Sequence, residues 1–329
     1  MIGPQHLSPR FPQRGRGARA AESGAAPDHG PRLESEYRPT GALDLFATVA
    51  VHQRGPGDPT ATIDRTGQVL WRATRTPDGV ATLALRQSAD GVVRLAAWGP
   101  GREWAIAQAP ALCGARDDLD GFEPRHPLIA EAHRRSPGLR IGGTDRLFDA
   151  LAQAITEQKV TLRQAFGAWR HVVQHSGERA PGPSPVPLYA PPSPEGWRRT
   201  PSWVWHRAGL EPPQARTIVE AAARADALER ASSSLDTALA SLRGIGAWTI
   251  AETRIRALGD ADAVSVGDFH LAHQVGFALT GSRVDDDGML ELLAPWAGHR
   301  YRVIRLIRAW GVTEPRRGAR VHMQDHRDH

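Results

Sequence analysis

Apolar and polar residues alternate along the first third of the chain. From about residue 42, apolar side chains recur at every second position, which is typical of strands that bury one face. This alternation predicts strands at 45–51, 69–74, 80–85 and 92–98. Asp-Gly pairs at 78–79 and 90–91 stand between the later runs and predict hairpin turns. We therefore expect a small antiparallel sheet in this region.

From about residue 126 the apolar spacing changes to three or four residues, which predicts amphipathic helices. Helices are expected near 144–155, 160–173, 201–210, 213–228, 235–242, 247–258 and 298–310. A proline-rich segment at 180–187 is interpreted as a break inside this helical region. Residues 1–36 are rich in Arg, Gly, Pro and Ala without periodicity, which predicts disorder. The expected organisation is a tail at 1–36, a strand-rich domain at 37–124, a helical domain at 125–312 and a C-terminal tail at 313–329.

The last predicted helix has two faces. Its apolar residues form one face, and three arginines spaced three residues apart, Arg302, Arg305 and Arg308, form another. These arginines are either a solvated helix face or contacts to phosphate groups.

A glycine-containing turn, Leu242-Arg-Gly-Ile-Gly246, joins two of the predicted helices. Glycine has no Cβ, so such a turn allows a phosphodiester to approach the backbone. The amide N–H groups of the turn then point at phosphate oxygens, and the positive end of the second helix adds to the attraction. The alternative is an ordinary helical hairpin in which the glycines serve only a tight turn.

One carboxylate follows this hairpin at a fixed distance. After the second helix and a short loop the chain reads Val266-Gly-Asp-Phe269. Asp268 is interpreted as a group that acts on a nucleotide bound by the hairpin. The alternative is an aspartate that only caps the helix beginning near Phe269.

Further motifs occur in a specific order around the hairpin and Asp268. They lie at 137–143, 154–161, 242–250 and 295–301. In this order and spacing the chain resembles the helix-hairpin-helix (HhH-GPD) DNA glycosylase superfamily over roughly residues 125–310, and within it the DNA-3-methyladenine glycosylase II branch. The resemblance implies a mainly α fold, with a helical HhH-GPD core and a small N-terminal antiparallel α+β domain. It also implies damaged double-stranded DNA as the partner.

The resemblance carries roles onto individual residues. It implies a catalytic Asp268, a base pocket walled by Trp248 and Glu252, and DNA contacts by Gly244, Ile245, Gly246, Thr249, Gln158 and Lys159. Trp248 has the alternative of packing between helices. Glu252 stands where the branch often has an aromatic residue, and its alternative is a surface or salt-bridging role beside Arg256. Lys159 stands where the branch has the leucine or glutamine that fills the gap left by an extruded base.

Lys159 is the only lysine of the chain. Glycosylases that also nick the strand attack the sugar with an amine, and an arginine guanidinium cannot replace that amine because it stays protonated. In the lyase branch of the family, the lysine that supplies this amine stands in the hairpin helix, at the position where this chain has Trp248. We therefore expect a monofunctional enzyme that leaves an abasic site, with Lys159 as the one alternative amine.

The expected chemistry needs few groups. Breaking an N-glycosidic bond builds an oxocarbenium-like sugar, which one carboxylate stabilises while it orients a water. An alkylated purine carries a positive charge and leaves as a neutral base without a general acid, which fits a site with one evident carboxylate. The alternatives are a glycosylase of the same fold for another lesion, such as a deaminated base, and a non-catalytic helix-hairpin-helix DNA-binding protein.

Composition adds few limits to this interpretation. The net charge of +5 suits a polyanionic partner. Cys113 is the only cysteine, so the chain has neither a disulfide framework nor the four thiolates of an iron–sulfur cluster. No spacing of His and Cys suggests a metal, and no cofactor is expected. No apolar stretch approaches the ~18 residues of a membrane span, and no signal-peptide core is evident. We expect a cytoplasmic monomer.

Overall fold

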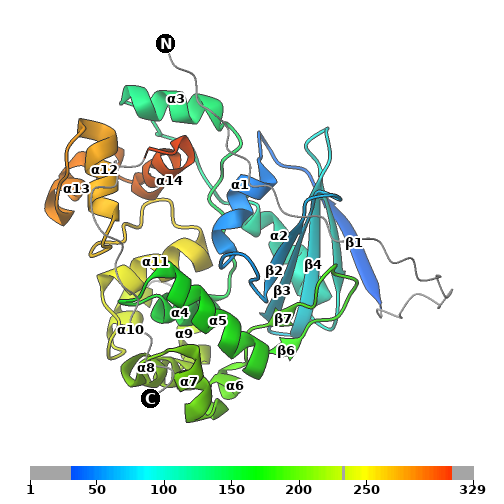
Figure 1. The fold of residues 1–329 in the computed structure, drawn as a ribbon. Helices are drawn as coiled ribbons and strands as arrows, with labels where there is room; N and C mark the ends of the chain where they lie inside the picture. The colour runs from blue at the N-terminus through cyan, green and yellow to red at the C-terminus, as the bar shows by residue number, and fades with distance from the viewer. Residues whose placement is uncertain (1–30, 232–233, 313–329) are drawn as a thin grey trace, which may run out of the picture.

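The computed structural model describes residues 31–231 and 234–312, which form a five-stranded antiparallel sheet beside a larger helical part (Figure 1). The order of the strands in the sheet is β1-β5-β4-β3-β2. The strands are β1 (Arg32–Tyr37), β2 (Ala61–Asp64), β3 (Val69–Thr76), β4 (Gly79–Gln87) and β5 (Val93–Trp98). The expected fold class, a mainly α protein with a small N-terminal α+β domain, is confirmed.

Three of the predicted strands are confirmed as β3, β4 and β5. The predicted tail is wrong at its end, because β1 begins at Arg32 and pairs with β5; the tail residues 1–30 lie outside the described residues. The strand predicted at 45–51 is also wrong. This segment forms the helix α1 (Leu45–Val49) and a 3-10 turn (Ala50–His52), because the Asp44 side chain caps the helix by accepting the Ala47 N–H.

Helix α2 (Arg102–Leu112) packs against one side of the sheet (Figure 1). It was not predicted. Its residues Ala105, Ala109 and Leu112 are buried together with apolar residues of α1, β3, β4 and β5, and they form the core of the N-terminal domain. The sheet therefore buries one of its faces against a helix of its own domain.

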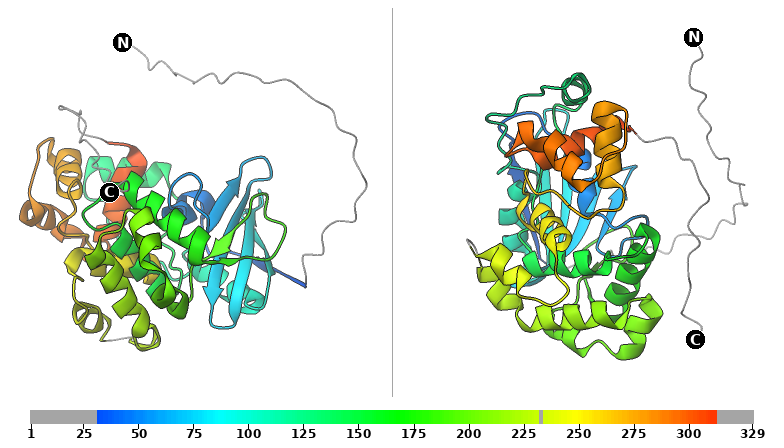
Figure 2. Two further views of the ribbon diagram at one scale, coloured as in Figure 1. Left: turned by 60° about the horizontal axis from the view of Figure 1, so that its bottom comes forward. Right: turned by 90° about the vertical axis from the view of Figure 1, so that its left-hand side faces the viewer.

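The helical part has two apolar cores that meet at one helix. Its helices are α3 (Pro127–Arg135), α4 (Leu147–Thr156), α5 (Leu162–Ser176), α6 (Pro194–Arg199), α7 (Ser202–Ala208), α8 (Pro212–Ala223), α9 (Ala225–Arg230), α10 (Leu235–Ala240), α11 (Ala247–Leu258), α12 (Leu271–Thr280), α13 (Asp286–Leu293) and α14 (Arg300–Trp310). Helices α4 to α10 form one core, and α3, α12, α13 and α14 form the other. Helix α11 contributes Ala257 to the first core and Ile255 to the second. Figure 2 shows these two groups of helices from two further sides.

The proline-rich break packs the helical part against the sheet. Two short strands, β6 (Glu178–Arg179) and β7 (Tyr189–Ala190), flank it and pair with each other. The Tyr189 N–H donates to the Pro59 carbonyl at 2.8 Å, and Leu188 is buried against β3 and β4. The segment therefore belongs to the interface between sheet and helices.

Two details of the predicted helices need correction. Leu258 ends the helix predicted at 247–258, but it is 41% exposed and does not join the buried face of α11. Arg302, expected to be solvated or bound to phosphate, is buried: its NH1 donates to Asp117 Oδ2 at 3.0 Å and its NH2 donates to the Asp118 carbonyl at 2.8 Å. The guanidinium thus binds the loop that leads into the helical part.

Candidate functional site

The hairpin turn lies between α10 and α11 and presents two exposed glycines. Gly244 has a φ of +86°, a left-handed conformation that glycine adopts most readily. Gly246 is the N-cap of α11 and offers no side-chain cap to the helix. Ile245, between them, is buried in the first helical core. The tip is thus anchored by one apolar side chain, while the N–H groups of the first turn of α11 have no partner within the helix.

Gln158, which follows the end of α4, binds the hairpin turn through its side-chain amide. Its Nε2 donates to the Gly244 carbonyl and to Thr249 Oγ1, both at 2.9 Å. Thr249 is 2% exposed, so its hydroxyl lies inside the protein. Gln158 and Thr249 therefore fix the shape of the turn.

Lys159 follows Gln158 in an exposed turn. Its φ of +55° is uncommon for a residue with a side chain and costs backbone energy. The turn ends at the capping box of Thr161, which begins α5. The only lysine is therefore presented on the surface directly beside the hairpin.

The carboxylate of Asp268 is held at both oxygens. Its Oδ1 accepts the N–H groups of His270 and Leu271, each at 2.9 Å, at the start of α12. Its Oδ2 accepts the Trp248 Nε1–H at 3.4 Å. The capping alternative is present in the structure and is compatible with a chemical role. The N–H donors at the start of α12 fix the direction of the carboxylate.

The loop before Asp268 is anchored by three other carboxylates. Asp286 Oδ2 accepts the Gly267 N–H at 2.9 Å. Asp262 binds Arg300 through a Nε–Oδ1 hydrogen bond of 2.8 Å, and Asp260 binds Arg254 at 2.7 Å. Asp286 lies in the first turn of α13, and Asp285 caps that helix by accepting the Gly288 N–H.

Both oxygens of Glu252 are occupied. Ser265 Oγ donates to its Oε1, and the Arg256 guanidinium binds its Oε2. Burial alone would raise the pKa of the Glu252 carboxyl, but the charge of Arg256 and the two hydrogen bonds outweigh it and leave the pKa below its ordinary value. The salt-bridging alternative for Glu252 is therefore realised in the structure.

The sequence interpretation brought together residues that the structure places in contact. Trp248 touches Asp268, and Gln158 touches both Gly244 and Thr249. Three other residues of the site were missed, because their partners lie at least 13 residues away in the chain and leave no local pattern: Glu157, Ser265 and Asp286.

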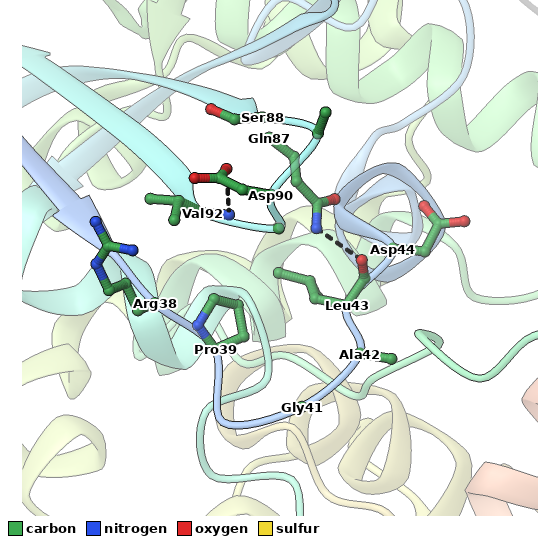
Figure 3. A pocket seen from close by; sticks show the side chains of 12 residues that line it. Arg38, Pro39, Gly41, Ala42, Leu43, Asp44, Gln87, Ser88, Asp90 and Val92 are labelled. Atoms are coloured by element: carbon green, nitrogen blue, oxygen red, sulfur yellow. Dashed lines mark hydrogen bonds between the residues drawn. The ribbon is translucent and has the colours of Figure 1, made fainter.

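The hollow drawn in Figure 3 has a volume of about 740 Å³ and lies elsewhere. It is formed by the segments 38–44 and 87–92 of the N-terminal domain, and none of its lining residues belongs to the hairpin or the Asp268 loop. Gln87 spans it by donating to the Leu43 carbonyl at 2.7 Å. Among residues 31–231 and 234–312, no group of three or more His, Cys, Asp and Glu side chains is arranged to hold a metal ion. Within the same ranges, each helix is too short or too polar to span a membrane.

No protein-family model and no curated protein matches the chain. Solved structures do match it. The 3-methyladenine DNA glycosylase from Archaeoglobus fulgidus has a TM-score of 0.71 and 17% sequence identity, over 84% of this chain and 98% of its own. The apo form of the 8-oxoguanine glycosylase/lyase of Clostridium acetobutylicum has a TM-score of 0.64 and 10% identity, over 84% and 96%. Its complex with double-stranded DNA has a TM-score of 0.62 and 12% identity, over 85% and 97%.

At these identities the likeness establishes the fold. The chain has the fold of the helix-hairpin-helix DNA glycosylases, as its sequence motifs predicted. Within that fold it is similar both to an enzyme named for 3-methyladenine and to enzymes named for 8-oxoguanine.

Proposed function

We propose that this protein is a monofunctional DNA glycosylase that hydrolyses the N-glycosidic bond of alkylated purines of the 3-methyladenine type and leaves an abasic site. The observation that carries the proposal is the contact between Trp248 Nε1 and Asp268 Oδ2 beside the glycine hairpin. It joins an aromatic ring, a fixed carboxylate and a phosphate-binding turn in one place. The proposed partner is damaged double-stranded DNA, bound by a monomer in the cytoplasm.

Each part of the site has a role in the proposed reaction. The N–H groups around Gly244 and Gly246 bind a phosphate and hold the strand, and Lys159 occupies the gap left by the extruded nucleotide. As the C1′–N bond breaks, the Asp268 carboxylate stabilises the cationic sugar and orients the water that attacks C1′. The bonding electrons leave with the base, and the water proton passes to Asp268.

The site favours a base that already carries positive charge. Such a base leaves as a neutral molecule and needs no proton from the protein. The Trp248 ring adds cation–π attraction, worth ~0.5–2 kcal/mol. Glu252 is engaged by Ser265 and Arg256, so the site offers Asp268 as its unneutralised carboxylate. This supports hydrolysis of a cationic lesion by a single acidic group.

The experiment measures base release from duplex DNA that carries methylated purines, under single-turnover conditions. At ~4 Å and an effective dielectric near 20, a carboxylate stabilises a sugar cation by about 4 kcal/mol. Asp268→Asn is therefore expected to slow release by about 10³-fold while it still binds the duplex. Asp285→Asn is the matched control, because it removes a neighbouring carboxylate and retains a good helix cap.

The other outcomes point to other functions. Release of hypoxanthine but of no methylated purine would assign a deaminated base as the substrate. Binding without release from any lesion would leave a DNA-binding protein. The abasic product of a monofunctional enzyme is broken only by alkali, so strand nicking without alkali that is lost in Lys159→Arg would contradict this part of the proposal.

A further inference from the structure

Four buried charged side chains next to the site are linked in series by ion pairs, and we call them the ion-pair chain. Arg256, on α11, binds two carboxylates: its NH1 binds Glu252, and its NH2 lies 3.2 Å from Glu157 Oε2. Glu157 in turn lies 3.2 Å from Nε of Arg54, which belongs to the N-terminal domain. These four side chains are at most 12% exposed. Along the ion-pair chain the charges alternate in sign, so two cations balance two anions.

This chain joins the two loops that border the site. Towards one side, Glu157 is the C-cap of α4 and directly precedes Gln158 and Lys159. At the other end, Glu252 accepts a hydrogen bond from the Ser265 hydroxyl. The Ser265 carbonyl accepts the Asp268 N–H at 3.2 Å. The position of the Asp268 loop is therefore connected through Ser265, Glu252 and Arg256 to the loop of Lys159.

The charges in the chain are fixed by their partners. Burial alone would lower the pKa of the Arg256 guanidinium, but Glu252 and Glu157 raise it above its ordinary value. A buried ion that loses its partner is strongly unfavourable, so each side chain is confined to the rotamer that keeps its pair. Such a chain holds the two loops at a set separation better than exposed ion pairs do.

We propose that Ser265, Glu252 and Arg256 are positioning residues that hold Asp268 against the nucleotide gripped by the hairpin; this inference rests on the proposed function of Asp268. None of the three needs to touch DNA. Their effect is on the rate of bond cleavage, because a small displacement of the carboxylate weakens its attraction for the sugar cation and its hold on the water.

Ser265→Ala tests the link with the smallest change. It removes one hydroxyl and leaves the Glu252–Arg256 pair in place. We expect the single-turnover rate constant to fall about 10- to 100-fold, the range for loss of a hydrogen bond to a charged group. The Kd for a duplex that contains an abasic-site analogue is expected to stay unchanged, because the hairpin is intact. An unchanged rate constant would overturn the proposal.

Glu252→Gln provides an independent second variant. The amide retains an acceptor for Ser265 but loses the charge that pairs with Arg256. If the residues act through one ion-pair chain, the double variant Ser265→Ala/Glu252→Gln releases base no more slowly than the slower single variant. Fully additive effects on the rate constant would contradict the proposal.

If Ser265, Glu252 and Arg256 only stabilised the fold, their substitution would change the amplitude of the single-turnover reaction and not its rate constant. Partial unfolding lowers the amplitude of the single-turnover reaction and leaves its rate constant unchanged, and that result would also overturn the proposal. Thr200→Val is the matched control for loss of a buried hydroxyl, since Thr200 Oγ1 donates to the Gly196 carbonyl at 2.9 Å within the fold. It is expected to lower Tm without changing the rate constant.

The two proposals fail in different ways. If Asp268→Asn is inactive while Ser265→Ala and Glu252→Gln match the wild type, the proposed function stands and positioning by this chain is refuted. If the wild type releases no base from any lesion, the proposed function fails and the positioning role falls with it.

Discussion

Gly246 allows folding and DNA binding to be separated in one substitution. A Cβ built on Gly246 has no atom within 4 Å, and its φ of −112° is accessible to alanine. At this N-cap position Ala is worse than Gly by roughly 0.5–1 kcal/mol, but the lower entropy of the unfolded chain returns about 0.4–1 kcal/mol. We expect the free energy of unfolding of Gly246→Ala to stay near that of the wild type.

DNA binding by Gly246→Ala is expected to change much more. The added methyl group projects into the open surface at the N-terminus of α11, where a phosphate must approach the amides. A hydrogen bond to a charged group contributes roughly 1.5–3 kcal/mol, so its loss weakens binding about 10- to 100-fold. Fluorescence anisotropy with a duplex that contains an abasic-site analogue measures this Kd, and urea denaturation measures stability.

Gly244→Ala, in contrast to Gly246→Ala, is expected to lower the free energy of unfolding. Its Cβ would lie 3.0 Å from Thr217 Oγ1, and a φ of +86° costs a residue with a side chain about 1–2 kcal/mol of folding free energy. Gly209, with a φ of +75° and open space around it, is the control for this strain away from the hairpin. The reasoning is refuted if Gly246→Ala binds DNA as tightly as the wild type while Gly209→Ala loses the expected stability.

Two further predictions concern buried charges. Burial raises the pKa of Asp149 to about 6, whereas an unfolded aspartate titrates near ~3.9, so the stability this group contributes is present below pH ~4 and lost as pH rises through ~6. Asp149→Asn is expected to raise the free energy of unfolding at pH 7 by up to about 3 kcal/mol and to leave it unchanged at pH ~4, as measured by urea denaturation; no gain at pH 7 would contradict this. Arg302→Met leaves Asp117 buried without its partner and is expected to destabilise the fold by about 3–5 kcal/mol, against about 0.5 kcal/mol or less for the exposed Arg308→Met. Equal effects of Arg302→Met and Arg308→Met on Tm would refute the assignment of Arg302 to a buried, stabilising ion pair.

Local patterns were sufficient for the hairpin and for the middle of the sheet. Strands β3, β4 and β5 are each six or more residues long, rich in apolar residues, and separated by Asp-Gly turns, so both the element and its end are encoded nearby. The turn before α11 likewise depends on glycines at two neighbouring positions. In these places the side chains that determine the structure are adjacent in sequence.

The errors in the N-terminal domain arose where a local pattern had two solutions. Strand β1 is polar, because it pairs only with β5 at the edge of the sheet, and it therefore looked like part of the tail. The segment 45–51 alternates, but its buried residues Leu45, Thr48 and Val49 also fit a helical spacing. The cap at Asp44 favours the helix, and a run of seven residues is too short for its period to decide.

Charged side chains were the least predictable, because each partner is chosen by the fold. Arg302 and Asp117 are 185 residues apart in sequence, and Arg256 and Glu157 are 99 apart. The three arginines of α14 look equivalent in sequence, yet the fold separates them. Arg302 pairs with Asp117, Arg305 donates to the Ala47 carbonyl at 2.7 Å, and Arg308 is exposed. Contact with a phosphate therefore remains an alternative for Arg308 alone, because the other two guanidinium groups bind the N-terminal half of the chain.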